Sequence, residues 1–242
     1  MATDTKKYNL IKASTRGHAD HGWLKSSHSF SFANYYDPER IHFGALRVLN
    51  DDYVAAGEGF GKHPHDNMEI ISIPLSGELK HGDSMGNTAV IKEGEVQVMS
   101  AGTGIIHSEM NNREDMAVEF LQIWIFPDKK NVKPRYDQKV IDKSLITNRL
   151  GQIVSPNENE EGVWFHQQAW FHLGEFSDNQ HVNYSVKKDG NGIYIFLLNG
   201  GAIVDGHKIE KRDALAITDA KTISIDINKN SKILVMEVPM AW

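Results

Sequence analysis

Two stretches of the sequence decide the fold: IISIPLSGEL at residues 70–79 and IYIFLLNGGA at residues 193–202. Each contains an apolar run of strand length followed by glycine, the residue that most easily adopts the backbone of a tight turn. Later in each half comes a charged turn with another apolar run, IKEGEVQVMSAGTG at 91–104 and IEKRDALAITDAK at 209–221. The same order of features in both halves predicts two copies of one β unit.

Short apolar or alternating segments continue this pattern along the chain. They are HFGALRVLN (42–50), TAVIK (88–92), GIIHSEM (104–110), AVEFLQIWIF (117–126), VWFHQQAWFHL (163–173), NYSVK (183–187), AIVDG (202–206), KTISIDI (221–227) and KILVMEV (232–238). Many short strands with closely spaced turns predict an all-β sandwich or barrel. The polar stretch PDKKNVKPRYDQKVIDK (127–143) predicts the crossing between the halves. We therefore expect two tandem, jelly-roll-like β-barrel domains, residues 1–130 and 131–242.

Composition narrows the class of partner. The 242 residues carry a formal net charge of −6 and no run of five basic residues, which argues against a nucleic-acid ligand. No cysteine is present, so disulfides and thiolate chemistry are excluded, and a metal could bind only through nitrogen and oxygen atoms. The sequence shows neither a secretory signal nor an apolar run long enough for a membrane helix, and we expect a cytoplasmic protein.

Two pairs of metal-binding residue types occur at strand spacing. His63 and His65 are two positions apart, as are His107 and Glu109. Side chains at i and i+2 of a strand point to the same face, so each pair shares a face, and two such strands in one barrel can bring four donors together. Imidazole and carboxylate suit a divalent first-row metal. Glu69 would face the same way as the histidines if the strand continued past His65, so spacing alone does not choose between Glu69 and Glu109.

Longer motifs resemble a known family. Gly57, His63, His65 and Glu69 resemble the first cupin signature, and GEVQVMSAGTGIIHSEMN, residues 94–111, is similar to the second. The phrases FSFANYYDP (30–38), HPHDNMEI (63–70), DSMGN (83–87), MSAGTGIIHSE (99–109) and QIWIFP (122–127) together resemble the pirin family of the cupin superfamily. The resemblance is strongest over residues 15–136, and within the family the bacterial pirin-like quercetin 2,3-dioxygenases are most similar.

The resemblance implies a bicupin fold with one metal site. The pirin pattern carries over as metal ligands His63, His65, His107 and Glu109, with Glu69 as the alternative carboxylate. Fe(II) is the metal we expect first, because a reaction with O2 needs a redox partner; Cu, Ni, Mn, Zn and Co are alternatives. In the second half the residues near Ile223 and Ile225 are apolar, so we expect no second metal there. The scattered His166, His172, His181 and His207 are interpreted as structural or exposed residues.

The activity that the resemblance implies is cleavage of a flavonol ring by O2, with release of carbon monoxide and a depside ester. The small-molecule partner is then quercetin or a related phenol, and Glu109 would act as the base that takes the hydroxyl proton. Phe43, Phe60 and Met68 flank the ligand strands and are candidates for the substrate pocket, although packing in the core is the default interpretation for such residues. His81 and Asp83 could support the metal ligands from outside the ligand set, but the interpretation we favour is a hairpin side-chain pair. The alternative is a metal-dependent regulatory module that binds a protein partner without catalysis.

Overall fold

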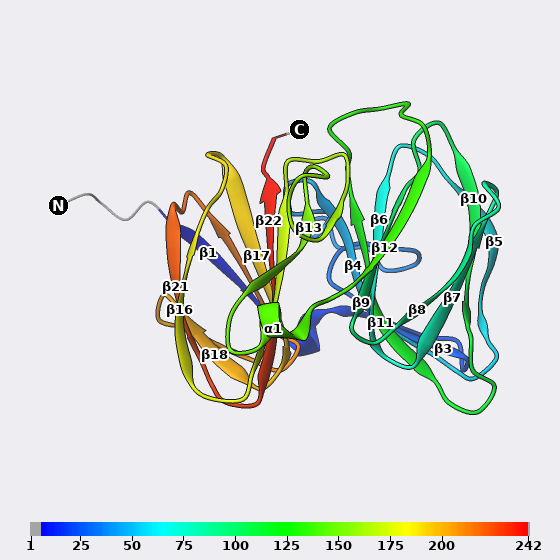
Figure 1. Cartoon of the computed structure of the whole chain (residues 1–242). Helices are drawn as coiled ribbons and strands as arrows, with labels where there is room; N and C mark the ends of the chain where they lie inside the picture. The colour runs from blue at the N-terminus through cyan, green and yellow to red at the C-terminus, as the bar shows by residue number, and fades with distance from the viewer. Residues whose placement is uncertain (1–5, 242) are drawn as a thin grey trace.

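The computed structural model describes residues 6–241, and these fold into two β-barrels side by side (Figure 1). The predicted all-β bicupin architecture is confirmed. In the described part of the chain, the helical elements are the single 3-10 turn η1 (Ala13–Thr15) and the four-residue α1 (Lys143–Ile146). No helix within this part has the length and apolarity that a membrane span requires.

The first barrel pairs a seven-stranded sheet with a four-stranded one. In order, the larger sheet contains β12 (Arg135–Val140), β9 (Glu95–Ser100), β6 (Glu69–Ser76), β11 (Val118–Ile125), β4 (Leu46–Val54), β3 (Leu24–His28) and β2 (Gly17–Asp20). The smaller sheet contains β5 (Gly59–His65), β10 (Ile105–Asn111), β7 (Glu78–Asp83) and β8 (Thr88–Lys92). The glycines that follow β6 and precede β9 lie in turns with positive φ, as the sequence predicts for Gly77 and Gly94.

The second barrel repeats this plan. Its larger sheet contains β1 (Lys7–Ile11), β20 (Ala214–Thr218), β17 (Asn191–Asn199), β22 (Ser231–Pro239), β15 (Trp170–Phe176), β13 (Gly151–Ser155) and β14 (Val163–Trp164). The smaller sheet contains β16 (Gln180–Ser185), β21 (Thr222–Ile227), β18 (Gly201–Val204) and β19 (His207–Glu210). Strand for strand, β5, β10, β7 and β8 correspond to β16, β21, β18 and β19, so the weak repeat in the sequence reflects a duplicated unit.

The two halves of the chain exchange edge strands across the predicted boundary at residue 130. Strand β1 pairs with β20 in the second barrel, although it precedes the first barrel in the sequence. Strand β12 pairs with β9 in the first barrel, although it lies beyond the boundary. Each exchanged strand completes one edge of a seven-stranded sheet and satisfies backbone groups that would otherwise be open to another chain. The predicted ranges therefore need this correction at residues 7–11 and 135–140, the latter inside the segment predicted as a linker.

The largest apolar cluster lies between the two seven-stranded sheets and takes residues from both barrels. Phe43 packs here, with its ring centroid 5.6 Å from that of Tyr194 in β17. Gly192 makes room for it, because a Cβ there would lie 2.7 Å from the tip of the Phe43 ring. The assignment of Phe43 to a substrate pocket is therefore wrong: its side chain belongs to the core that joins the barrels.

The interiors of the two barrels differ in polarity. The second is filled mainly by isoleucine, leucine and valine. In the first, β11 alternates Phe120, Gln122 and Trp124 on its inward face, so that a buried glutamine separates two apolar clusters. Ser72 of β6 and Gln97 of β9 are buried at the same level. This polar band lies across the middle of the first barrel, because buried polar groups gather where they can satisfy one another.

Candidate metal centre

Neighbouring antiparallel strands position the histidines. His63 of β5 is the direct Cα partner of His107 of β10, and His65 is the partner of Ile105. Since directly opposed residues share a face, all three imidazoles point into the first barrel. One ring nitrogen from each of His63, His65 and His107 lies within 4.8 Å of the others. The ring centroids are 4.4–4.9 Å apart.

The donor atoms of this cluster are suited to a metal ion. Among residues 6–241, Nε2 of His65 and both ring nitrogens of His107 are buried without a hydrogen-bond partner. Nδ1 of His63 lies 2.7 Å from the carbonyl oxygen of Gly61, to which it must donate, so Nε2 keeps its lone pair. Unpaired buried polar atoms are costly, and a shared cation would satisfy one nitrogen of each ring at once. The residues present therefore fit a metal.

The electrostatics of the cluster favour neutral imidazoles. Burial, together with the neighbouring His63 and His65, lowers the pKa of His107 to about 2. Burial and the adjacent His63 lower the pKa of His65 to about 4. Near neutral pH both rings are therefore uncharged, which is the form that binds a metal.

Glu109 lies two residues beyond His107 on β10 and is buried, with 2% of its surface exposed. In the described structure its carboxylate is not among the atoms that gather within 4.8 Å. It instead lies in hydrogen-bond contact with Ser72 Oγ at 2.8 Å and Gln122 Nε2 at 2.9 Å. Burial raises its pKa to about 7, against the lowering effect of these two bonds. The structure thus brings three of the four predicted ligands together and holds the fourth in the adjoining polar band.

Glu69 faces away from the histidines. Strand β5 ends at His65, the chain turns through Asn67 at a φ of 43°, and β6 begins at Glu69. The strand is therefore not continuous, and the face predicted from even spacing does not carry over the turn. Glu69 accepts a 2.6 Å hydrogen bond from Ser100 Oγ and packs on the side of the second barrel, where burial raises its pKa to about 8.

The aromatic surroundings of the cluster differ from those predicted. Met68 does pack beside the site, in the apolar cluster that includes Trp124 and Tyr136. Phe60 packs instead with Trp23 in the other apolar cluster, at a centroid distance of 5.5 Å. Sequence reasoning missed Trp124, whose ring lies edge-on to His65 at 4.9 Å. The alternation of Gln122 and Trp124 in a buried strand was the available signal for it.

The second barrel lacks an equivalent cluster in its corresponding strands. In β21, which occupies the place of β10, the inward residues are the buried Ile223 and Ile225. His181 on β16 is exposed and lies 2.7 Å from Asp226. His172 is buried, with its ring against Tyr184 at 5.1 Å. The exposure of His181 agrees with the interpretation given to it from the sequence, whereas Nδ1 of His172 is buried without a hydrogen-bond partner among the described residues.

Comparison with known proteins agrees with the fold. The model of the pirin family matches residues 10–125, and a model described as the quercetinase C-terminal cupin domain matches residues 152–238. A protein of Escherichia coli strain K12 named quercetin 2,3-dioxygenase is 42% identical over 231 residues, covering 95% of this chain and 98% of that protein. The chain belongs to the pirin family.

Solved structures are similar to this chain over nearly its whole length. The crystal structure of the bacterial pirin YhhW from Escherichia coli in complex with nickel(II) has a TM-score of 0.91 and 39% sequence identity, with 96% of this chain and 99% of that chain covered. A quercetin 2,3-dioxygenase from Acinetobacter baumannii has a TM-score of 0.77 at 21% identity, with 97% and 87% covered. The second likeness concerns the fold alone. The first shows a pirin of the same architecture that binds a divalent metal.

Proposed function

We propose that this pirin is a metal-dependent dioxygenase that opens the flavonol ring of quercetin-like substrates. The observation that carries the proposal is the cluster of His63, His65 and His107, whose nitrogens face into the first barrel without partners among the described residues, apart from the bond of His63 to Gly61. The names of its relatives support the substrate class, since a pirin 42% identical is called a quercetin 2,3-dioxygenase. The overall reaction joins one flavonol and one O2 and yields a depside and carbon monoxide.

The metal would be held by His63, His65, His107 and Glu109. Glu109 lies on the same strand as His107. To bind the metal with the histidines, it would give up its hydrogen bonds with Ser72 and Gln122. We propose Fe(II) first, with Cu, Ni, Mn, Zn or Co as alternatives, because nitrogen and oxygen donors accept all of them. When bound, such a metal acts as a Lewis acid that favours the deprotonated form of a phenol.

Other residues of the chain would position the substrate and handle its proton. Trp124 and Met68 form an apolar surface beside His65 that suits a flat aromatic ring. In the metal-free protein burial raises the pKa of Glu109 to about 7. Beside a bound metal its carboxylate would be ionised and could accept a proton. We assign it the removal of the substrate hydroxyl proton. The oxygen of that hydroxyl would then carry the negative charge on which the reaction with O2 depends.

The test measures quercetin loss and carbon monoxide release in air and without oxygen, for protein loaded with Fe(II). We expect oxygen-dependent turnover that His63→Ala abolishes. His181→Ala is the matched control, because His181 lies on β16, the strand that corresponds to β5 in the second barrel. Turnover in the control at the wild-type rate would exclude a general effect of histidine removal. Absence of turnover in wild-type protein confirmed to hold metal would refute the dioxygenase and favour the regulatory alternative.

A further inference from the structure

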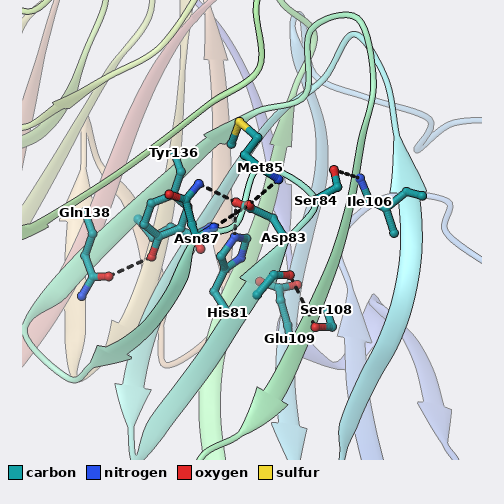
Figure 2. A network of polar contacts seen from close by, with 12 residues as sticks. His81, Asp83, Ser84, Met85, Asn87, Ile106, Ser108, Glu109, Tyr136 and Gln138 are labelled. Carbon is teal, nitrogen blue, oxygen red and sulfur yellow. Dashed lines mark hydrogen bonds and ion pairs between the residues drawn. The ribbon is translucent and has the colours of Figure 1, made fainter.

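A buried, hydrogen-bonded pair of side chains adjoins the candidate metal centre without belonging to its ligand set. Nε2 of His81 lies 2.9 Å from Oδ2 of Asp83, and both side chains have 0% exposure. The two residues lie two apart on β7, so the contact runs along one strand and is not the cross-strand hairpin pair expected from the sequence. Strand β7 pairs with β10, where Asp83 lies opposite His107 and His81 lies opposite Glu109. Figure 2 shows His81 between Asp83 and Tyr136, with Glu109 on the neighbouring strand.

Asp83 fixes which nitrogen of His81 carries the proton. Its Oδ1 accepts the backbone N–H groups of Met85 and Asn87, and its Oδ2 accepts the side-chain amide of Asn87 at 2.9 Å (Figure 2). With three N–H groups donating to its two oxygens, the carboxylate acts as an acceptor, so Nε2 of His81 donates its proton to Oδ2.

The other ring nitrogen of His81, Nδ1, consequently has an unprotonated lone pair that can accept a hydrogen bond. A proton on Nδ1 would be a buried N–H without an acceptor in the described structure, so Nδ1 is the nitrogen without a proton. This atom is buried and has no hydrogen-bond partner within residues 6–241. Tyr136 stacks on the ring at 4.5 Å but directs its own hydroxyl to Gln138 Oε1 at 2.8 Å. The stacking holds the ring plane while leaving Nδ1 free to accept.

His107 lacks an acceptor for the nitrogen that would not bind the metal. A histidine that binds a metal through one nitrogen carries a proton on the other, and that N–H requires an acceptor. His63 has one in the carbonyl oxygen of Gly61, whereas both nitrogens of His107 lack a partner in the described structure. The rings of His81 and His107 are 5.5 Å apart between centroids. That separation accommodates an N–H···N contact of about 2.9–3.0 Å with part of a ring on either side.

We propose that His81 is a positioning residue, whose Nδ1 accepts the N–H of His107 when His107 binds a metal, with Asp83 fixing the tautomer that makes this possible. The proposal rests on the metal centre included in the proposed function, but not on the dioxygenase reaction. The metal, His107, His81 and Asp83 would then form one line of successive contacts. Asn87 holds the far end of this line through its hydrogen bonds to Asp83. An outer partner of this kind orients the ligand ring and makes it more basic, which tightens metal binding.

Two substitutions test the proposed contact between His107 and His81, one by removing the acceptor and one by changing the tautomer of His81. His81→Phe keeps an aromatic ring against Tyr136 and removes the acceptor. Asp83→Asn keeps the shape, but its oxygen is needed by the N–H groups of Met85 and Asn87, so its NH2 group faces His81. The ring must then accept through Nε2 and carry its proton on Nδ1, which opposes the N–H of His107. His172→Phe is the matched control, because His172 is also buried, rests on a tyrosine and has an unpartnered Nδ1, but lies in the second barrel.

The measurement is the affinity for Co(II), from competition with a chelator, on proteins whose metal-free forms melt like wild type. We expect His81→Phe and Asp83→Asn to bind Co(II) roughly 10–100-fold more weakly, and His172→Phe to bind it as wild type does. Proton NMR of the Co(II) proteins supplies a readout that a purely structural role would not change. The shifted N–H signal of His107 should exchange slowly with D2O in wild type and rapidly in His81→Phe.

Each outcome decides the proposal. Unchanged Co(II) affinity and slow exchange in both variants would overturn it, as would equal weakening by His172→Phe. If His81→Phe fails to fold, Asp83→Asn alone gives the same decision. Wild type that binds no Co(II) would overturn both this line and the metal centre. Wild type that binds Co(II) through this line, but shows no quercetin turnover with Fe(II), would leave the line standing and refute only the dioxygenase.

Discussion

The hydroxyl oxygen of Ser72 lies 2.8 Å from Oε1 of Glu109 and also 2.8 Å from Oε1 of Gln122. Ser72 has one proton and cannot donate to both oxygens. A proton on Glu109 resolves the conflict, because Glu109 then donates to Ser72 and Ser72 donates to Gln122. The pKa of Glu109, raised by burial to about 7, agrees with a carboxyl group that holds its proton in this network. The polar band of the first barrel is therefore satisfied best when Glu109 is neutral.

Replacing Glu109 by glutamine should stabilise the metal-free protein at alkaline pH. Because the folded pKa of about 7 exceeds the ordinary value of 4.5, the folded state holds a proton that the unfolded state has lost, and the free energy of unfolding falls as pH rises between these values. The introduced glutamine has no proton to lose and can donate its amide to Ser72. We expect a gain of up to about 3 kcal/mol at pH 8 and less than about 1 kcal/mol at pH 5. Urea unfolding at the two pH values measures it; an equal effect at both would contradict the protonation argument.

The same substitution should weaken metal binding. Glutamine keeps the size of Glu109 but supplies no negative charge to the cation, and its amide is held by the Ser72 network. We expect a loss of affinity for Co(II) larger than the roughly 10–100-fold that removal of an outer partner costs, together with loss of quercetin turnover. Chelator competition and carbon monoxide release measure the two effects. Wild-type affinity and turnover in Glu109→Gln would remove Glu109 from both the ligand set and the role of base.

The face shared by His63 and His65 could be predicted from the sequence because its geometry is local, by the two-residue repeat of a strand. The repeat of apolar runs likewise predicted the duplicated barrels, since each run is long enough to be a strand by itself. In both cases the pattern depends on spacing within one element. That His107 joins the other two histidines depends on the pairing of β5 with β10, and this part of the prediction came from the resemblance to the pirin family.

Features that depend on a turn or on distant pairing could not be predicted in this way. The φ of 43° at Asn67 separates Glu69 from the face of His65, and spacing does not reveal such a turn. The exchange of β1 and β12 follows from which sheet edge is open, which is a property of the whole fold. Phe43 is an aromatic residue of the kind that often lines a pocket. Its ring instead packs in the core, because Gly192, far away in the sequence, has no Cβ to block it. The tautomer of His81 likewise depends on where the side chain of Asp83 lies, which the sequence alone does not give.

Glu69→Gln should separate the two carboxylates that the sequence left as alternatives. Glu69 lies outside the histidine cluster, so we expect Co(II) affinity to stay close to that of wild type. Its pKa of about 8, raised by burial from 4.5, means that the free energy of unfolding declines from pH 4.5 to about 8 and then levels off. Glutamine avoids this decline, and we expect a gain of up to about 5 kcal/mol at pH 9 and less than about 1 kcal/mol at pH 5. A loss of Co(II) binding in Glu69→Gln would contradict the observation that the Glu69 side chain faces away from the histidine cluster.

The turn after His65 should control how long a metal stays bound. Oδ1 of Asn67 accepts the backbone N–H of Asn131 at 2.7 Å, which ties this turn to the segment between the barrels. Asn67→Gly keeps the positive φ and loses the tie, at a cost of about 0.5–1.5 kcal/mol. Asn67→Ala loses both and should cost roughly 1 kcal/mol more.

The control for this turn is Asn148→Gly. Asn148 also has a positive φ, of 55°, and its Oδ1 accepts the backbone N–H of Ser177 at 2.9 Å, but it lies beside the second barrel. We expect all three variants to lose stability in urea. Only the two at Asn67 should release Co(II) to a chelator faster than wild type, because only that turn holds the end of β5 and with it His65. Equal release rates in Asn67→Gly and Asn148→Gly would show that the tie stabilises the fold without supporting the metal centre.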